Sequence, residues 1–409
     1  QRSRLYAFAM FKLAWSLYKQ GQYDNALKTV EKVIYHGRKS KGRGDKSAKG
    51  VSSVRLASEA LKDLVVFYAE AGDYKDAYDY FYKVAGKKTG PSIYERLGYY
   101  YADRGNRTAA RHIFSELIRR DPISPKAFEL KYKLVTMFST AGSEKIFKEE
   151  LFEWIEQYGP GSSWQKANAK NQDLINKLQL LAEATLRNFT LQYHQTAQNS
   201  RAKHSQDMAQ SGYQLYFTTF KNSERQDEMH FFYGELMYDF KSYSRAAASY
   251  IWVVENAKSS QYFKQSLLNA ILSLERLLPS TSEIRNIVGE NTQPIEFDKS
   301  IKDFERLAKE YFEKVPNGEN TVEIKYKLGT LYYYYNQFEP ALAIFKSIVK
   351  SHPKSKFAEY SANLILDIYN LRKDYVGLEK AADEILAVPG LKTSGIGEQV
   401  DSIKQRSIF

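Results

Sequence analysis

The sequence predicts an all-α protein, a right-handed solenoid of antiparallel helix pairs. Three observations support this prediction. A pattern of about 34 residues recurs along the chain. Each copy holds two stretches whose apolar residues are three or four positions apart, the spacing of one helix face. No segment alternates polar and apolar residues between turns, so we expect almost no β-sheet.

The clearest copy is ERLGYYYADRGNRTAARHIFSELIRRDP, residues 95–122. Its first helix is expected to be short, because Gly105 can adopt a positive φ and end it. Gly98 and Ala110 are small where the two helices must approach each other. Pro122 stands where the second helix has to stop, since proline cannot continue a helix. The apolar stripes of the two helices comprise Tyr94, Leu97, Tyr101, Phe114 and Leu117.

The same frame recurs in six other segments, namely 11–33, 61–84, 132–155, 231–254, 326–353 and 364–386. The copy at 132–155 is weaker, because Phe147 replaces the small residue of the second helix. This pattern resembles the tetratricopeptide repeat. The resemblance covers more than half of the chain, and it implies stacked helix pairs whose first helices line a concave groove.

The repeats and the segments between them predict four regions. Residues 1–157 form an N-terminal sub-array of four repeats, interrupted by a basic loop at 36–53. Residues 158–225 form a helical connector without the repeat signature. Residues 226–392 form a C-terminal sub-array that includes degenerate helices over 261–315 and a loop at 278–297. Residues 393–409 form a tail.

The resemblance implies that fixed positions of each first helix line the groove. In this sequence they supply Phe8, Trp15, Tyr18, Tyr99, Asp103, Phe231, Glu235, Tyr238, Tyr326, Tyr333 and Tyr334. This set is aromatic and acidic, although the chain carries a formal net charge of +12. Acidic residues repel phosphates, so the set favours a protein or peptide over a nucleic-acid strand. The alternative is that these aromatic residues pack between repeats.

The strongest local charge lies at 36–50, where six Lys or Arg residues accompany one Asp. Five of them are candidates for contact with an anion: Arg38, Lys39, Lys41, Arg43 and Lys46. The motif GRGDKS within this stretch is not a phosphate-binding P-loop, because Asp45 separates the glycine from the lysine and no strand precedes it. We therefore expect at most peripheral contact with an anionic surface.

The sequence contains no recognisable catalytic or metal-binding motif. It has no cysteine, its six histidines show no metal-ligand spacing, and no nucleophile motif occurs. No run of 18 apolar residues predicts a membrane span. The expectation is a non-enzymatic protein with no catalytic residue, no metal and no cofactor.

The function predicted from the sequence is a scaffold that binds partner proteins through the groove of a multi-protein assembly. The lack of cysteine and the abundance of tyrosine and lysine favour the periplasm or cell envelope. This Tyr-rich, Lys-rich and cysteine-free composition resembles that of bacterial envelope repeat proteins, namely outer-membrane assembly lipoproteins of the BamD/YbgF type and gliding-motility proteins. The alternatives are a cytoplasmic location, a helical-repeat nucleic-acid-binding protein, and a regulatory repeat region of a longer protein.

Overall fold

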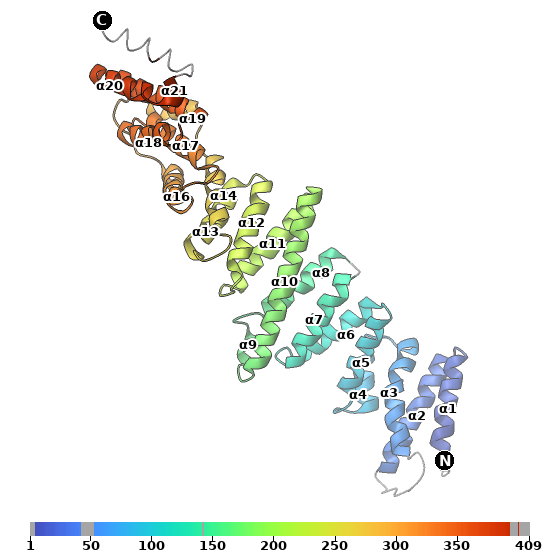
Figure 1. Cartoon of the computed structure of the whole chain (residues 1–409). Coiled ribbons are helices and arrows are strands. Elements are labelled where there is room, and N and C mark those ends of the chain that lie inside the picture. The colour runs from blue at the N-terminus through green and yellow to red at the C-terminus, as the bar shows by residue number, and fades with distance from the viewer. Residues whose placement is uncertain (1–4, 42–52, 141–142, 393–399, 401–409) are drawn as a thin grey trace. The chain divides into compact units, whose positions relative to one another are not determined.

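A computed structural model describes residues 5–41, 53–140, 143–392 and 400 (Figure 1). Every regular element in these residues is a helix, and no strand occurs among them. The predicted all-α solenoid is thereby confirmed. The helices divide between two compact units, which are described separately.

The first unit, residues 1–189 with 218–220, consists of consecutive helix pairs. Its helices are α1 (Tyr6–Lys19), α2 (Tyr23–Lys41), α3 (Ser53–Ala71), α4 (Ala77–Ala85), α5 (Gly90–Asp103), α6 (Arg107–Arg120), α7 (Pro125–Thr140), α8 (Glu144–Tyr158) and α9 (Ser163–Ala167). Each predicted repeat of the N-terminal sub-array is one such pair. Helix α2 extends to Lys41, into the segment that the sequence predicted as a loop.

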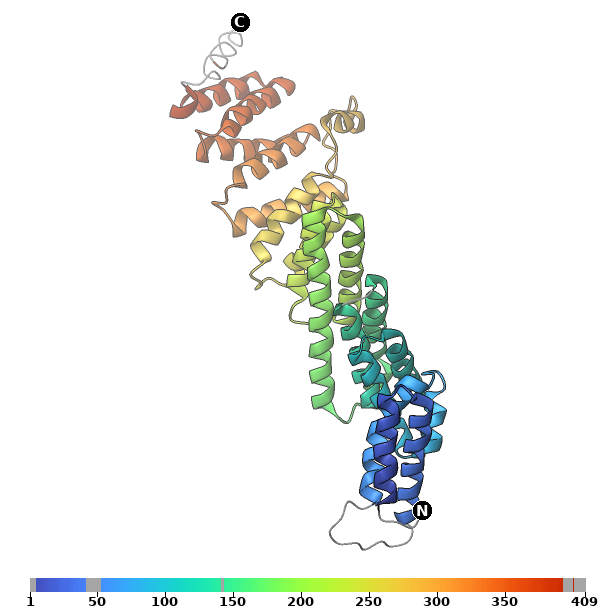
Figure 2. The same ribbon diagram turned by 90° about the vertical axis from the view of Figure 1, so that its right-hand side faces the viewer.

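The second unit comprises residues 190–217 and 221–409. Its helices are α11 (Lys203–Thr219, in greater part), α12 (Gln226–Asp239), α13 (Tyr243–Asn256), α14 (Phe263–Glu275), α15 (Thr281–Val288), α16 (Lys299–Lys314), α17 (Thr321–Tyr334), α18 (Phe338–Ser351), α19 (Lys356–Leu371), α20 (Tyr375–Leu386) and α21 (Pro389–Lys392). The long helix α10 (Gln172–Ser200), conspicuous in Figure 2, contains the boundary at residues 189 and 190. That boundary lies within residues 158–225; the four-region division itself stays a prediction.

Helix α15 occupies part of the segment predicted as a loop at 278–297. A capping box starts it. The Ser280 hydroxyl accepts a hydrogen bond from the Glu283 amide, and the Glu283 carboxylate accepts one from the Ser280 amide at 2.7 Å. These two bonds satisfy donors that would otherwise be unpaired at the helix start. The loop prediction was wrong here because turn-forming residues surround an eight-residue helix.

Within a pair, a glycine of the first helix lies directly against an aromatic ring of the second. A Cβ atom built on Gly98 would lie 2.6 Å from Cε1 of Phe114, and one on Gly329 would lie 2.6 Å from Cε1 of Phe345. No side chain fits in that space. The small residue predicted at this position therefore sets the distance between the helices.

The turn inside a repeat requires a left-handed residue. Gly105 has a φ of 78° at the end of α5, as the sequence predicted. The corresponding residue after α12 is Lys241, with a φ of 60°. A side chain is disfavoured in this region because its Cβ approaches the backbone carbonyl. The turn geometry is thus kept in repeats that lack the glycine.

Candidate protein-binding surface

The predicted groove residues all lie on the first helices of the pairs. We call the surface formed by successive first helices the first-helix face; it comprises α1, α3, α5 and α7 in the first unit and α12, α14, α17 and α19 in the second. Direct helix contacts join α1 to α3, α3 to α5, and α17 to α19. Side chains at predicted groove positions therefore lie beside the next first helix.

In the first unit, Trp15 and Tyr18 connect α1 to α3. The indole Nε1 of Trp15 donates a hydrogen bond to Oδ2 of Asp63 at 3.1 Å. The rings of Trp15 and Tyr18 pack on Phe67, with centroids 4.9 and 5.3 Å away. Burial raises the pKa of the Asp63 carboxyl, and the bond from Trp15 opposes this shift. Phe8, in contrast, is exposed.

Further along the same unit, Tyr99 is half-buried on α5. Its ring lies 5.1 Å from that of Phe114, and Nζ of Lys133 on α7 lies 5.8 Å from its centroid. Burial is the main cause that raises the pKa of Tyr99. Asp103, at the end of α5, is exposed.

In the second unit, α12 carries an aromatic and acidic group. Phe231 stacks on Tyr262 at 4.7 Å with an angle of 20° between the rings. One carboxylate oxygen of Glu235 accepts hydrogen bonds from the Tyr250 hydroxyl at 2.5 Å and from Nδ2 of Asn269 at 2.8 Å. Glu235 thus joins α12 both to its own partner helix α13 and to the next first helix, α14.

Tyr238, also on α12, lies with its ring 5.2 Å from that of Tyr243 at the start of α13. Its hydroxyl raises the pKa of the Arg276 guanidinium through a side-chain hydrogen bond. Arg276 immediately follows α14, so this bond also reaches the next repeat.

The aromatic groove positions of α17 contact α19. The Tyr326 ring lies 5.2 Å from Phe357, and the Tyr333 hydroxyl donates a hydrogen bond to the Asp367 carboxylate. Burial, followed by this bond, raises the pKa of Tyr333. Tyr334 is half-buried, and its ring lies 5.2 Å from that of Tyr333.

Most of the groove positions therefore also take part in inter-repeat packing, whereas Phe8 and Asp103 are exposed. The sequence analysis did not identify the residues of the next repeat that these side chains contact, such as Asp63, Lys133 and Asp367. A signal for two of them existed: Asp63 and Lys133 both directly precede the leucine of the Leu-Gly position, Leu64 and Leu134. The groove role of the predicted residues stays a prediction.

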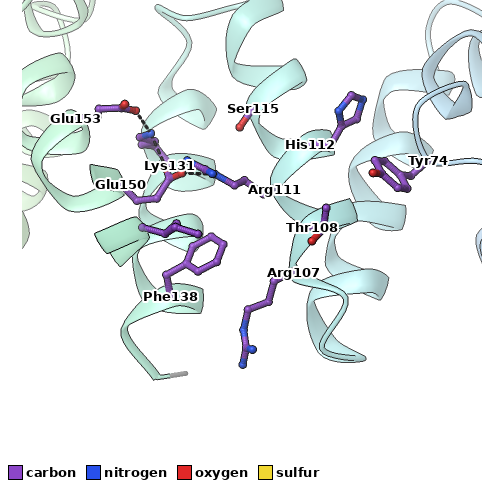
Figure 3. Close-up of a pocket in the computed structure, with 11 residues that line it drawn as sticks. Tyr74, Arg107, Thr108, Arg111, His112, Ser115, Lys131, Phe138, Glu150 and Glu153 are labelled. Carbon is purple, nitrogen blue, oxygen red and sulfur yellow. Dashed lines mark hydrogen bonds and ion pairs between the residues drawn. The ribbon is translucent and has the colours of Figure 1, made fainter. Parts of the chain in front are cut away.

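A pocket of about 440 Å³ lies among α6, α7 and α8 of the first unit (Figure 3). The Glu150 carboxylate, almost fully buried, pairs with Nε of Arg111 and with Nζ of Lys131, both at 2.6 Å. Lys131 also pairs with Glu153 at 2.6 Å. The charges satisfy one another, so the cluster fastens three helices together and is not arranged around a ligand.

Two histidines of the second unit are held neutral. Nδ1 of His194 lies 2.7 Å from the Tyr213 hydroxyl. His230 is stacked between Phe217 and Trp252, with both pairs of ring centroids 4.0 Å apart. Burial lowers the pKa of each imidazole to about 4. Among the described residues, no group of three or more histidine, aspartate or glutamate side chains is placed to hold a metal ion.

The predicted anion-contacting residues are only partly described. Arg38 and Lys39 are exposed near the end of α2, and Nζ of Lys39 lies 4.7 Å from the centroid of the Tyr35 ring. Arg43, Lys46 and the side chain of Lys41 lie outside the described residues. Across the ranges that the structure describes, no helix has the length and apolarity needed to cross a bilayer.

Consecutive antiparallel helix pairs with a repeated glycine contact define the class: an α-helical repeat protein. Residues 8–36 and 323–355 match the family model described as tetratricopeptide repeat. These two segments are therefore tetratricopeptide repeats, as the sequence indicated. These repeats generally serve as non-catalytic scaffolds for protein–protein interaction. No curated protein matches the chain.

Solved structures of other repeat proteins are similar over most of their length. The tetratricopeptide domain of P58(IPK) is 13% identical with a TM-score of 0.22, covering 98% of this chain and 97% of that one. The C-terminal part of a repeat protein from Cytophaga hutchinsonii is 13% identical with a TM-score of 0.19, covering 95% and 98%. The human IFIT1 dimer with m7Gppp-AAAA is 15% identical with a TM-score of 0.25, covering 99% and 91%.

Proposed function

We propose that the chain is a scaffold that binds a protein or peptide partner on its first-helix face, within a multi-protein assembly of the cell envelope. One observation carries the proposal: half-buried aromatic rings recur on first helices of the second unit, and on α12 a half-buried carboxylate accompanies them. Phe231 and Glu235 occupy α12, and Tyr326, Tyr333 and Tyr334 occupy α17.

The packing of these rings suits recognition. Phe231 is stacked on Tyr262, and Tyr333 is hydrogen-bonded to Asp367, so their conformations are fixed before a partner arrives. A fixed ring loses little conformational entropy on binding, and its remaining exposed surface still excludes water from a contact. Glu235 in the second unit, and separately Asp103 in the first, favour partner segments that carry Lys or Arg.

Two features support the envelope location. The chain has no cysteine, which suits an oxidising compartment, and it holds 32 tyrosines. Fractionation of the source cells, with the protein detected by a specific antibody, tests this part. Recovery in the cytoplasmic fraction alone would remove the envelope from the proposal and leave the scaffold.

Site-specific photocrosslinking in the source cells tests the scaffold. A photoreactive phenylalanine analogue replaces Tyr334 on α17 in one variant and Tyr375, which is 55% exposed at the start of the second helix α20, in the control. We expect a defined protein adduct from position 334 that Phe231→Ala weakens, and no such adduct from position 375. An adduct that forms equally from both positions contradicts binding on the first-helix face.

A further inference from the structure

The second helices α2 and α4 of the first unit end side by side. Midway along them, the Tyr80 hydroxyl donates a hydrogen bond to Oε1 of Glu31 at 2.6 Å. At their carboxyl ends, Nη2 of Arg38 lies 3.9 Å from the point where a Cβ on Gly86 would stand. The end of α2 therefore faces the turn that follows α4.

Five cationic side chains gather at this end, and we call them the basic edge: Arg38, Lys39, Lys83, Lys87 and Lys88. All five are exposed. Neither stretch that supplies them, 36–39 or 83–88, contains an acidic residue. The like charges are thus left uncompensated within these stretches, which creates a local positive potential.

Exposed apolar side chains lie at the same end of the unit. Tyr35 is 62% exposed and Tyr82 is 37% exposed; Tyr82 is about one turn and Tyr35 about two turns from the end of its helix. Leu5, 70% exposed, precedes α1. The Tyr6 ring contacts that of His36 at 5.4 Å, which places the start of α1 beside the end of α2.

We propose that the basic edge binds the surface of a membrane that contains anionic lipids. Four of its five cations are lysines, compact charges that respond to a diffuse surface potential without directed hydrogen bonds. Tyrosine and leucine beside lysine are suited to the headgroup region, where rings and aliphatic groups enter the interface. A nucleic-acid strand would use the lysines and stack on Tyr35 and Tyr82, but it would gain nothing from Leu5, whereas the lipid interface accommodates Leu5 and both rings.

Vesicle co-sedimentation of the full chain tests this proposal. The vesicles contain phosphatidylcholine alone or phosphatidylcholine with phosphatidylglycerol. We expect binding only to the second kind, weakened by added salt. The variant K83E/K87E/K88E should lose more than about tenfold of the partition coefficient, because each lysine near an anionic surface contributes to binding.

The control variant K350E/K354E/K380E changes the net charge by the same amount in the second unit. Lys350 is in the last turn of α18, as Lys83 is in α4, so each variant reverses one charge at a helix end. The control should bind within about twofold of the wild type. If both variants lose vesicle binding equally, the loss reflects only the net charge of the protein and the proposal is overturned. Equal binding of the wild type to both vesicle types would overturn it as well.

Circular dichroism shows whether the glutamate variant folds, and K87Q/K88Q replaces it if it does not. Fluorescence anisotropy with single-stranded RNA is the second arm. RNA binding that depends on Lys83, Lys87 and Lys88, without vesicle binding, would assign the edge to nucleic acid and refute the lipid assignment. The crosslinking result at Tyr334 is independent of these outcomes, so this inference and the scaffold can fail separately.

Discussion

Replacing Gly329 by alanine tests how the helix pairs are held together. Both Gly329 and Phe345 are buried, and the new Cβ would lie 2.6 Å from Cε1, 3.0 Å from Cδ1 and 3.1 Å from Cζ of the ring. Alanine favours the helix by about 1 kcal/mol over glycine. Overpacking a filled core costs roughly 1–3 kcal/mol. The buried ring has no room to withdraw, so we expect a net loss near the upper end, about 1–2 kcal/mol.

The chain itself offers the compensating change. The first repeat has Ala14 where Gly329 stands, and Val30 where the ring of Phe345 stands. Phe345→Val should therefore cost less in the Gly329→Ala background than in the wild type, with a coupling energy of at least about 1 kcal/mol. Urea unfolding of the two single variants and the double variant measures it. A Gly329→Ala variant as stable as the wild type, or strictly additive variants, would refute the close-packing argument.

Three further perturbations have expected outcomes. Glu150→Gln leaves Lys131 and Arg111 without their buried carboxylate and should lower the unfolding free energy by about 3 kcal/mol; an unchanged urea midpoint contradicts this. Lys241→Gly relieves a φ of 60° and should raise stability by about 1 kcal/mol, measured by thermal melting, and a lower melting temperature would exclude backbone strain there. His194 and His230 bind protons more readily in the unfolded chain, because burial lowers their pKa values to about 4. The free energy of unfolding should therefore be highest above about pH 6.5 and fall by roughly 3 kcal/mol per histidine towards pH 4. His230→Phe should weaken this pH dependence, and an unaltered pH profile would show that the stacked ring does not titrate.

The sequence was sufficient for the helix pairs because the signals for them are local. The spacing of Leu97, Gly98 and Tyr101 defines one helix face within two turns, and Gly105 marks the end of that helix. Helix α15 was not found, because Ile284 is its only buried residue and the apolar stripe is too short to show a period.

Features that depend on several helices could not be predicted in this way. The stack of Phe217, His230 and Trp252 takes one ring from each of α11, α12 and α13. Lys131 and Glu150 occupy positions that on an isolated helix would be exposed. Their burial follows from how α6, α7 and α8 meet, and no spacing in the sequence encodes that meeting.

In the proposed function, the first-helix face both stacks the repeats and contacts a partner. A ring such as Tyr333 presents one part of its surface to Asp367 on the next repeat and leaves the rest accessible. Loss of the ring would loosen the junction between α17 and α19 as well as remove contact area. The stiffness that fixes the ring for recognition is thus supplied by the neighbouring repeat. If the proposed function holds, affinity at one repeat depends on the packing of the next, and binding of a partner across two repeats should stabilise their junction in return.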